Sequence, residues 1–154
     1  MGKNREEKFW QNITEAEQGN MKAQYYVASA YFDGVGVSKD WEKALQWFKA
    51  AGEQGNVDAL YMVGMMYQFG KGVEPNMTES FRWYIKAAEL GDAESQYRVG
   101  NSYHLGRGVI QDKMAAVAWW LKAAEQGHEK AKNNVSTAYY RGEGVPKDKD
   151  EAAK

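Results

Sequence analysis

The sequence predicts an all-α fold, an α-solenoid built from about four 36-residue helix-turn-helix repeats with an extra N-terminal helix. Two periodic features predict it. The pattern Gly-x-Gly-Val recurs at a fixed interval of 36 residues, beginning at Gly34, Gly70, Gly106 and Gly142. A second set of glycines has the same interval and lies at Gly19, Gly55, Gly91 and Gly127. One such repeat cannot bury its apolar face alone, so neighbouring repeats must stack, and function is expected on a surface.

The length of 154 residues fits one domain, and no Pro-, Ser- or Gly-rich linker interrupts the repeats. We therefore expect a single solenoid domain over residues 1–154. Its expected parts are a helix over about 5–18 and repeats at 19–54, 55–90, 91–126 and 127–154, the last of them incomplete.

Composition excludes several classes of function. The chain carries 20 Lys and Arg against 21 Asp and Glu, a net charge of −1, and the two signs are interspersed. Nucleic acid is therefore not an expected partner, because binding phosphates needs clustered positive charge. The absence of Cys excludes disulfides and thiolate metal sites. No apolar run approaches the roughly 18 residues that span a bilayer, so no membrane insertion is expected.

The compartment follows from the first residues, which lack the apolar stretch of a signal peptide. A cytoplasmic protein is the default prediction. The alternative is a periplasmic or secreted protein from which a signal peptide has been removed.

The extra N-terminal helix contains Phe9, Trp10 and Ile13 near its start. It has the character of the second helix of a degenerate preceding repeat. We expect it to cover the apolar end of the first full repeat.

The first helix of each repeat begins after a Gly-Asn-type dipeptide, because Gly suits the end of a helix and Asn or Asp suits the N-cap of the next. In the first repeat it should span about 21–33, with Ala23, Val27 and Tyr31 on one face. The same face in the other repeats holds Ala59, Val63, Tyr67, Ser95, Val99, Tyr103, Ala131, Val135 and Tyr139. These columns predict the core. A small-residue column beside them, Ala28, Gly64, Gly100 and Ser136, indicates close helix packing.

The Gly-x-Gly-Val segment that follows is expected to be a turn, since glycine permits backbone conformations that a Cβ resists. A phosphate-binding loop is not expected, because the segment follows a helix and lacks the lysine and serine of such loops.

The second helix of each repeat should begin at an N-cap, namely Asp40, Asn76, Asp112 or Asp148. Glu79 and Glu151 stand three residues further on and predict a capping box in two repeats. Trp47, Trp83 and Trp119 recur at one position, and aromatic residues at helical spacing are typical of core.

The 36-residue unit resembles the Sel-one-like repeat family, relatives of the tetratricopeptide repeats. Residues 91 to 127 carry the resemblance best, with Ser95, Val99, Gly100, Tyr103, Gly106, Gly108, Val109, Asp112, Ala116, Trp119, Ala123, Ala124, Glu125 and Gly127. Departures are Asn76 for Asp, Ser80 and Ser95 for Ala, and Gly52 for the second Ala of an Ala-Ala pair. The resemblance implies a right-handed α-solenoid that acts as an adaptor for proteins or peptides. Bacterial members are associated with signalling scaffolds, host interaction and immunity against secreted effectors.

The columns of the first helix that do not recur predict the binding surface. Positions 22, 26, 29 and 33 of the first repeat fall within about a 60° arc, and their equivalents continue this stripe. In related repeat families the first helix lines a concave wall, so the stripes should form a groove for a protein or peptide partner. The candidate binding residues are Tyr26, Ser29, Asp58, Met62, Met65, Phe69, Glu94, Arg98, Asn101, Leu105, Asn134 and Arg141. Met62, Met65 and Phe69 give it an apolar middle with a polar rim, which is typical of protein interfaces.

Alternatives stay open at this point. These side chains could pack on a loop or on another copy, which would make the protein a structural or assembly subunit and a homo-oligomer. The last repeat stops at Lys154, before its expected Trp, so either the natural chain continues or a partner covers that end.

An enzyme is not expected, because no acid, base or nucleophile groups have convergent spacing. His104 and His128 lie on different elements, and His128 holds an N-cap position. We expect no cofactor and no metal, since two dispersed His without Cys form no ligand set.

Overall fold

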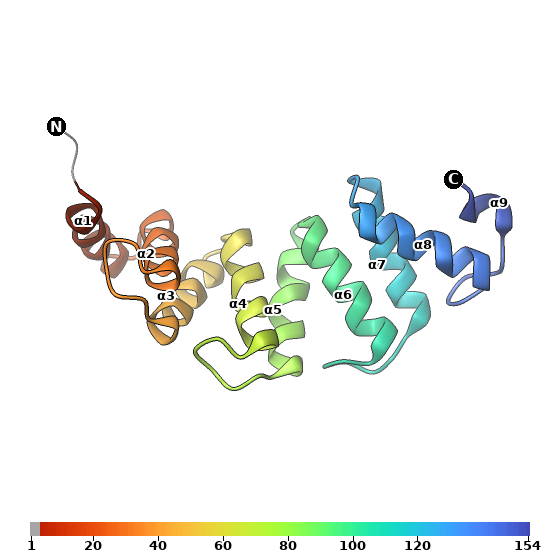
Figure 1. Cartoon of the computed structure of the whole chain (residues 1–154), viewed down its shortest axis with the longest axis horizontal. Coiled ribbons are helices and arrows are strands. Elements are labelled where there is room, and N and C mark those ends of the chain that lie inside the picture. The colour runs from red at the N-terminus through yellow and green to blue at the C-terminus, as the bar shows by residue number, and fades with distance from the viewer. Residues whose placement is uncertain (1–3) are drawn as a thin grey trace. The chain divides into compact units, whose positions relative to one another are not determined.

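The computed structural model describes residues 4–154, and over that range the chain is helical with no strand (Figure 1). The helices are α1 (Arg5–Glu17), α2 (Met21–Asp33), α3 (Trp41–Glu53), α4 (Val57–Phe69), α5 (Met77–Glu89), α6 (Ala93–Leu105), α7 (Lys113–Glu125), α8 (Glu129–Arg141) and α9 (Lys149–Ala152). The prediction of an all-α fold of consecutive helix pairs is confirmed.

The helices group into two compact units, which are described one at a time. Unit 1 runs to Asn76 and holds α1 to α4, with α2 packed on α1 and α3, and α3 on α4. Unit 2 begins at Met77 and holds α5 to α9, each helix packed on the next.

The helix boundaries come from local capping chemistry. Asn20, Asn56, Asp92 and His128 are the N-caps of α2, α4, α6 and α8, and each side chain accepts a hydrogen bond from a backbone N–H three residues on. Each of these helices ends at a left-handed glycine, the first of a Gly-x-Gly-Val turn. The predicted start and end of each first helix are confirmed.

The second helices are capped differently from the prediction. Asp40, Asp112 and Asp148 are N-caps as expected. The backbone N–H of each N-cap, including Asn76, donates to the carbonyl of the core Tyr near the end of the preceding helix, for example Asp112 to Tyr103 at 2.9 Å. The capping box predicted at Glu151 is therefore wrong, because the Asp148 N–H that it needs is already used. The box at Glu79 stays a prediction.

The core follows most of the predicted first-helix columns, and Val27, Val63 and Val99 are fully buried. Tyr103, Val135 and Tyr139 of the same columns are only half-buried. The aromatic column of the second helices lies one residue later than predicted. Phe48, Tyr84 and Trp120 point inward, whereas Trp47 and Trp119 are only half-buried. Trp83 is buried as expected. Adjacent apolar residues lie only 100° apart on a helix, so their spacing leaves open which one enters the core.

The N-terminal helix packs as a second helix of a preceding repeat, as predicted. Phe9 is fully buried, and its ring meets Tyr31 edge-on with centroids 5.1 Å apart. Trp10 of the same helix remains 55% exposed.

The second glycine of each Gly-x-Gly-Val turn does more than permit a turn. Gly72 touches the first residue of α3 in the preceding repeat, so a Cβ there would lie 2.6 Å from the Trp41 carbonyl oxygen. Gly36 meets Arg5, Gly108 meets Met77 and Gly144 meets Lys113 in the same way. Since real Cβ atoms do not approach so closely, only glycine lets the turn rest on the helix of the neighbouring repeat.

Hydrogen bonds of glutamine side chains join neighbouring repeats at two places. Gln54 Nε2 donates to the Gly19 carbonyl and to Gln24 Oε1, and Gln24 Nε2 donates to the Ala16 carbonyl. Unit 2 has the same three bonds. Gln126 Nε2 donates to the Gly91 carbonyl and to Gln96 Oε1, and Gln96 Nε2 donates to the Ala88 carbonyl.

Leu60 occupies the position of Gln24 and Gln96, and it accounts for the unusual Gly52. Leu60 is buried, and a Cβ at Gly52 would lie 3.1 Å from its Cδ2. The missing methyl at Gly52 makes room for the branched side chain.

The contact of the second glycine predicts a large cost of substitution. Gly108→Ala should lower the free energy of unfolding by about 2 kcal/mol more than Gly91→Ala, as measured by urea denaturation. Both glycines have positive φ, 73° and 100°, so both variants carry backbone strain. Only Gly108 faces a neighbouring backbone, since a Cβ at Gly91 meets nothing within 4 Å. Equal losses in the two variants would show that the contact contributes nothing.

Candidate functional site

The stripe predicted on the first helices lies at the surface, and none of its twelve proposed binding residues is buried. In unit 1, Tyr26 and Ser29 of α2 are half-buried, as are Met62 and Met65 of α4. Asp58 is exposed. Phe69, at the end of α4, is 56% exposed.

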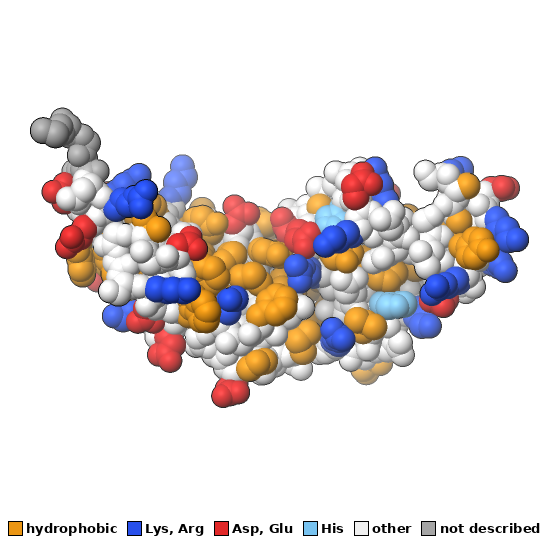
Figure 2. Space-filling model, in the orientation of Figure 1, with side chains coloured by type: hydrophobic (Ala, Val, Ile, Leu, Met, Phe, Trp, Pro, Cys, Tyr) orange, Lys and Arg blue, Asp and Glu red, His pale blue; other side chains and the backbone are white. Residues whose placement is uncertain are grey.

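Aromatic and cationic side chains extend this surface of unit 1. The Phe32 and Trp41 rings lie 6.1 Å apart. The Lys71 ammonium stands 4.2 Å from the centre of the Trp41 ring, and Lys39 stands 4.6 Å from it. Figure 2 shows hydrophobic side chains gathered over α3 and α4. Cations over indole faces are held by electrostatic attraction, so the edge of this apolar surface is positively charged.

Part of the stripe in unit 2 is taken up by an internal network. Arg98 Nε donates to Glu94 Oε1 at 3.0 Å, and His128 Nε2 lies 2.6 Å from Glu94 Oε2. The His128 ring also stacks on Tyr97, with centroids 4.6 Å apart. Glu94 thus joins α6 to the N-cap of α8 in the free protein, and Arg98 pairs with Glu94 within α6.

His128 has a fixed tautomer in this network. Its Nδ1 accepts the N–H of Ala131 as the N-cap of α8 and therefore carries no proton. The proton sits on Nε2 and is donated to Glu94. Partial burial favours a raised pKa for the Glu94 carboxyl, but the hydrogen bonds from His128 and Arg98 outweigh it and lower that pKa.

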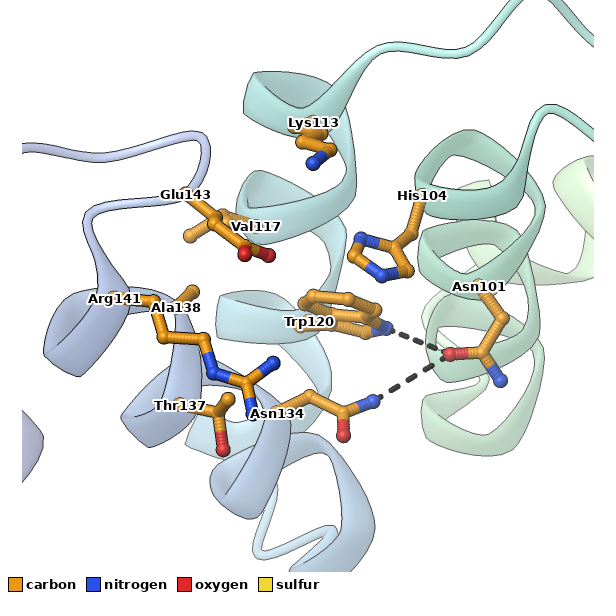
Figure 3. Close-up of a pocket in the computed structure, with 10 residues that line it drawn as sticks. All are labelled: Asn101, His104, Lys113, Val117, Trp120, Asn134, Thr137, Ala138, Arg141 and Glu143. Carbon is orange, nitrogen blue, oxygen red and sulfur yellow. Dashed lines mark hydrogen bonds between the residues drawn. The ribbon is translucent and has the colours of Figure 1, made fainter.

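The remaining residues of the stripe in unit 2 border a cavity of about 150 Å³. Figure 3 shows its lining, which comes from α6, α7, α8 and the turn after α8. Asn101 and His104 belong to α6, Lys113 and Trp120 to α7, and Arg141 ends α8. Asn134 also lines the cavity, whereas Leu105 of α6 is 52% exposed outside its lining.

An amide pair organises this cavity. Trp120 Nε1–H donates to Asn101 Oδ1 at 3.1 Å, and Asn134 Nδ2 donates to the same oxygen at 3.5 Å. Because an indole N–H can only donate, the Asn101 oxygen must face it, and the Asn101 NH2 must point away. His104 lies against the same indole, with ring centroids 5.2 Å apart.

The apolar surface of unit 1 and the cavity of unit 2 occupy equivalent places in the repeat. Moving every cavity residue back by two repeats, 72 positions, yields seven residues of the unit 1 surface and three buried ones, Leu45, Phe48 and Met66. These are Ser29, Phe32, Trp41, Leu45, Phe48, Met62, Met65, Met66, Phe69 and Lys71. One place in the repeat is therefore aromatic and Met-rich in unit 1, and polar and cationic in unit 2.

Sequence reasoning missed the part of the cavity that does not come from the stripe. His104, Lys113, Trp120 and Glu143 line it without belonging to the stripe. A signal was present, because Trp120 is the only residue in the column of Phe48 and Tyr84 whose ring carries an N–H. A buried indole N–H needs an acceptor, and Asn101 is the only amide in the column of Ser29.

Over residues 4–154, no group of three or more His, Cys, Asp or Glu side chains is placed to hold a metal ion. Within that same range, no helix has both the length and the apolarity needed to cross a membrane.

Comparison with known proteins identifies the family. The Sel1 repeat model matches residues 22–56, 57–92, 93–128 and 130–154. Because these matches cover most of the sequence, the chain belongs to the Sel1 repeat family. Proteins of this family generally mediate protein–protein interactions and are typically non-enzymatic scaffolds. No curated protein matches the chain.

Two solved bacterial structures are similar in sequence and fold. A protective antigen of uropathogenic Escherichia coli strains, described as displaying an SLR fold, is 38% identical over 94% of this chain with a TM-score of 0.88. A Sel1 repeat protein from Oxalobacter formigenes is 39% identical over 97% of this chain with a TM-score of 0.83. This chain spans 31% and 43% of the lengths of those two chains.

A third structure shows the fold alone. Cysteine rich protein B of Helicobacter pylori is 21% identical, with a TM-score of 0.65, over 85% of this chain and 97% of its own length. The chain described here contains no Cys.

The cap formed by His128 predicts a graded response to substitution. His128→Ala should lower the free energy of unfolding by about 1 kcal/mol, the usual cost of a lost N-cap. His128→Asn should lose less, since Asn20 and Asn56 cap the equivalent helices. Urea denaturation at pH 7 measures both, and equal losses would contradict the capping role.

The lowered pKa of Glu94 predicts a pH-dependent stability. Its folded pKa lies below its ordinary value of 4.5, so the ionised form stabilises the fold above that value. This stabilisation is lost as the pH falls through the folded pKa. Wild type should therefore exceed Glu94→Gln in stability at pH 7 by less than about 1 kcal/mol, because Glu94 is partly exposed. The difference should shrink in unfolding experiments as the pH falls below 4.5, and a constant difference would contradict the assignment.

Proposed function

We propose that the protein is a non-enzymatic binding module that takes a protein or peptide partner on the exposed stripe of its first helices. In unit 1 the stripe is centred on Met62, Met65 and Phe69. The observation that carries the proposal is the exposure of Phe69, 56%, beside two half-buried methionines on the same helix face. These three residues stand in columns that do not recur and that the core does not use.

The chemistry of this surface suits an apolar segment of a partner. Methionine side chains are flexible and polarisable, so they adapt to irregular shapes. Exposed Asp58 stands at one edge of the surface, and Lys71 stands over Trp41 at another. An apolar centre with a charged rim is the usual composition of a protein interface. The bound segment would bury its own apolar side chains against α4.

The stripe of unit 2 offers a more polar surface. Asn101, Asn134 and Arg141 line its cavity, and Leu105 is exposed on the same helix as Asn101. Glu94 and Arg98 are already paired with each other, so a partner would meet them as a neutral pair. We assign affinity mainly to unit 1 and selectivity mainly to unit 2, because apolar burial is non-directional and polar contacts are directional.

The narrower role that we propose is that of a bacterial adaptor or an immunity protein that neutralises a secreted effector. It is supported by membership of the Sel1 repeat family and by the bacterial origin of the similar structures. A toxin gene beside the gene for this protein would favour immunity, and a signalling gene would favour an adaptor.

The binding surface is tested by a triple variant, Met62→Ser/Met65→Ser/Phe69→Ser. Wild-type protein immobilised on resin should capture from its native source a partner that mass spectrometry identifies. The triple variant should retain less than about a tenth of that partner, since such central apolar residues dominate interface energies. Circular dichroism should show that the variant keeps its helices.

A matched control makes the same chemical change elsewhere. Ile110 and Met114 are 89% and 73% exposed and lie outside the stripe, so Ile110→Ser/Met114→Ser should capture as wild type does. Unchanged capture by the triple variant would overturn the proposal. A wild-type protein whose solution mass rises with concentration, and whose self-association the triple variant abolishes, would favour the assembly subunit instead.

A further inference from the structure

The cavity of unit 2 has a small apolar floor. Val117, Trp120 and Ala138 form this floor, each at most 5% exposed. The volume is about 150 Å³, and an apolar cavity of roughly that size can hold a benzene-sized group. A space of that size holds one side chain of a ligand, whereas a helix or strand does not fit into it.

Two cations of the cavity have no counter-ion. Lys113 and Arg141 form no ion pair within residues 4–154, and both are exposed at the rim. Some other basic side chains of unit 2 are engaged: Arg82 pairs with Glu79, Lys132 pairs with Glu129, and Lys122 stands over Trp119. Figure 3 shows Lys113 and Arg141 among the residues around Trp120, with the two side chains on different sides of its ring.

The charge of the lining matches a ligand with a single negative charge. Glu143 is the one acidic residue among those that line the cavity, so Lys113 and Arg141 leave a surplus of one positive charge, with His104 neutral. A doubly charged phosphate would face the Glu143 carboxylate with only that surplus to balance it. The single negative charge of a carboxylate is balanced by the surplus of one positive charge.

The Arg141 guanidinium supplies hydrogen-bond donors beside the apolar floor, and its planar fork suits carboxylates.

We propose that this cavity binds one Asp or Glu side chain of an acidic peptide segment. The carboxylate pairs with Arg141 and Lys113, and the methylene stem lies on the Trp120 ring. This inference rests on the proposed function, since it names the partner chemistry that unit 2 recognises.

The test uses two short peptides with blocked ends, Ala-Ala-Ser-Glu-Ala-Ala and the same peptide with Gln in place of Glu. Each is titrated into the full ¹⁵N-labelled chain while the Trp120 indole N–H signal is followed by NMR. Trp120→Phe identifies that signal, and it is expected to fold because Phe48 fills the equivalent position. The Glu peptide should shift the signal and bind about tenfold more tightly than the Gln peptide, the effect of one charge-assisted hydrogen bond.

Variants at the rim locate the effect. Arg141→Gln and Lys113→Gln should each weaken binding of the Glu peptide about five- to tenfold. Arg107→Gln and Lys130→Gln remove the same charge from exposed positions of unit 2 outside the cavity and should change the affinity less than about twofold, as screened charges do.

Three outcomes would overturn the assignment: equal binding of the Glu and Gln peptides, equal effects of rim and control variants, or tighter binding of inorganic phosphate than of the Glu peptide. Partner capture separates this failure from that of the proposed function. If the Met62, Met65 and Phe69 triple variant loses the partner while Arg141→Gln keeps it in full, the cavity assignment fails and the binding module stands. If wild type captures no partner that the triple variant loses, the proposed function fails, whatever the peptides do.

Discussion

Backbone contact between neighbouring repeats is the constraint on which the rest of the structure depends. In each repeat the second glycine of the Gly-x-Gly-Val turn touches the first turn of the second helix of the preceding repeat, as Gly72 does at Trp41 and Gly108 does at Met77. Any side chain there would push the turn away from that helix. The contact fixes the register of the stack, and the Val and Tyr columns can then form a continuous core within each unit.

In that register, one face of each first helix is not needed for packing the core. The same place in the repeat has been filled differently in the two units. Phe32, Trp41 and the methionines of α4 make it apolar in unit 1, whereas His104, Lys113 and Asn134 make it polar in unit 2. Phe48 and Trp120 occupy equivalent core positions in their repeats. Only the Trp120 indole carries an N–H, and it donates that N–H to Asn101. A repeat fold can thus vary its binding chemistry while its core stays the same.

The fold was predictable from the sequence because its determinants are local. Asn20, Asp40 and Asp112 cap helices through hydrogen bonds to residues three positions on, and such chemistry is visible in the sequence. The capping box at Glu151 failed for a reason that is not local, since the N–H of Asp148 donates to Tyr139 across the turn. The core position of Trp120 rather than Trp119 also depends on which face meets α6 and α8.

The candidate site was predictable only in part. Met62, Met65 and Phe69 could be selected because they break the repeat pattern and because the fold leaves them at the surface. The cavity of unit 2 could not be predicted as a whole, since it combines Asn101, Lys113 and Arg141 from three helices. The pairing of Glu94 with His128, 34 residues away, was equally hidden, because each looks locally like a solvated or capping residue.

The central claim is that partners are recognised by the free columns of the first helices, and single cysteines test it most directly because the chain has none of its own. Cysteines would replace Ser29, Met65 or Thr137 on the first helices, and Gln46, Thr78 or Ala118 on the second helices. Maleimide labelling rates are then compared with and without the captured partner. The account predicts that the partner slows labelling on the first helices and leaves the second helices unchanged. Slower labelling confined to the second helices would contradict it.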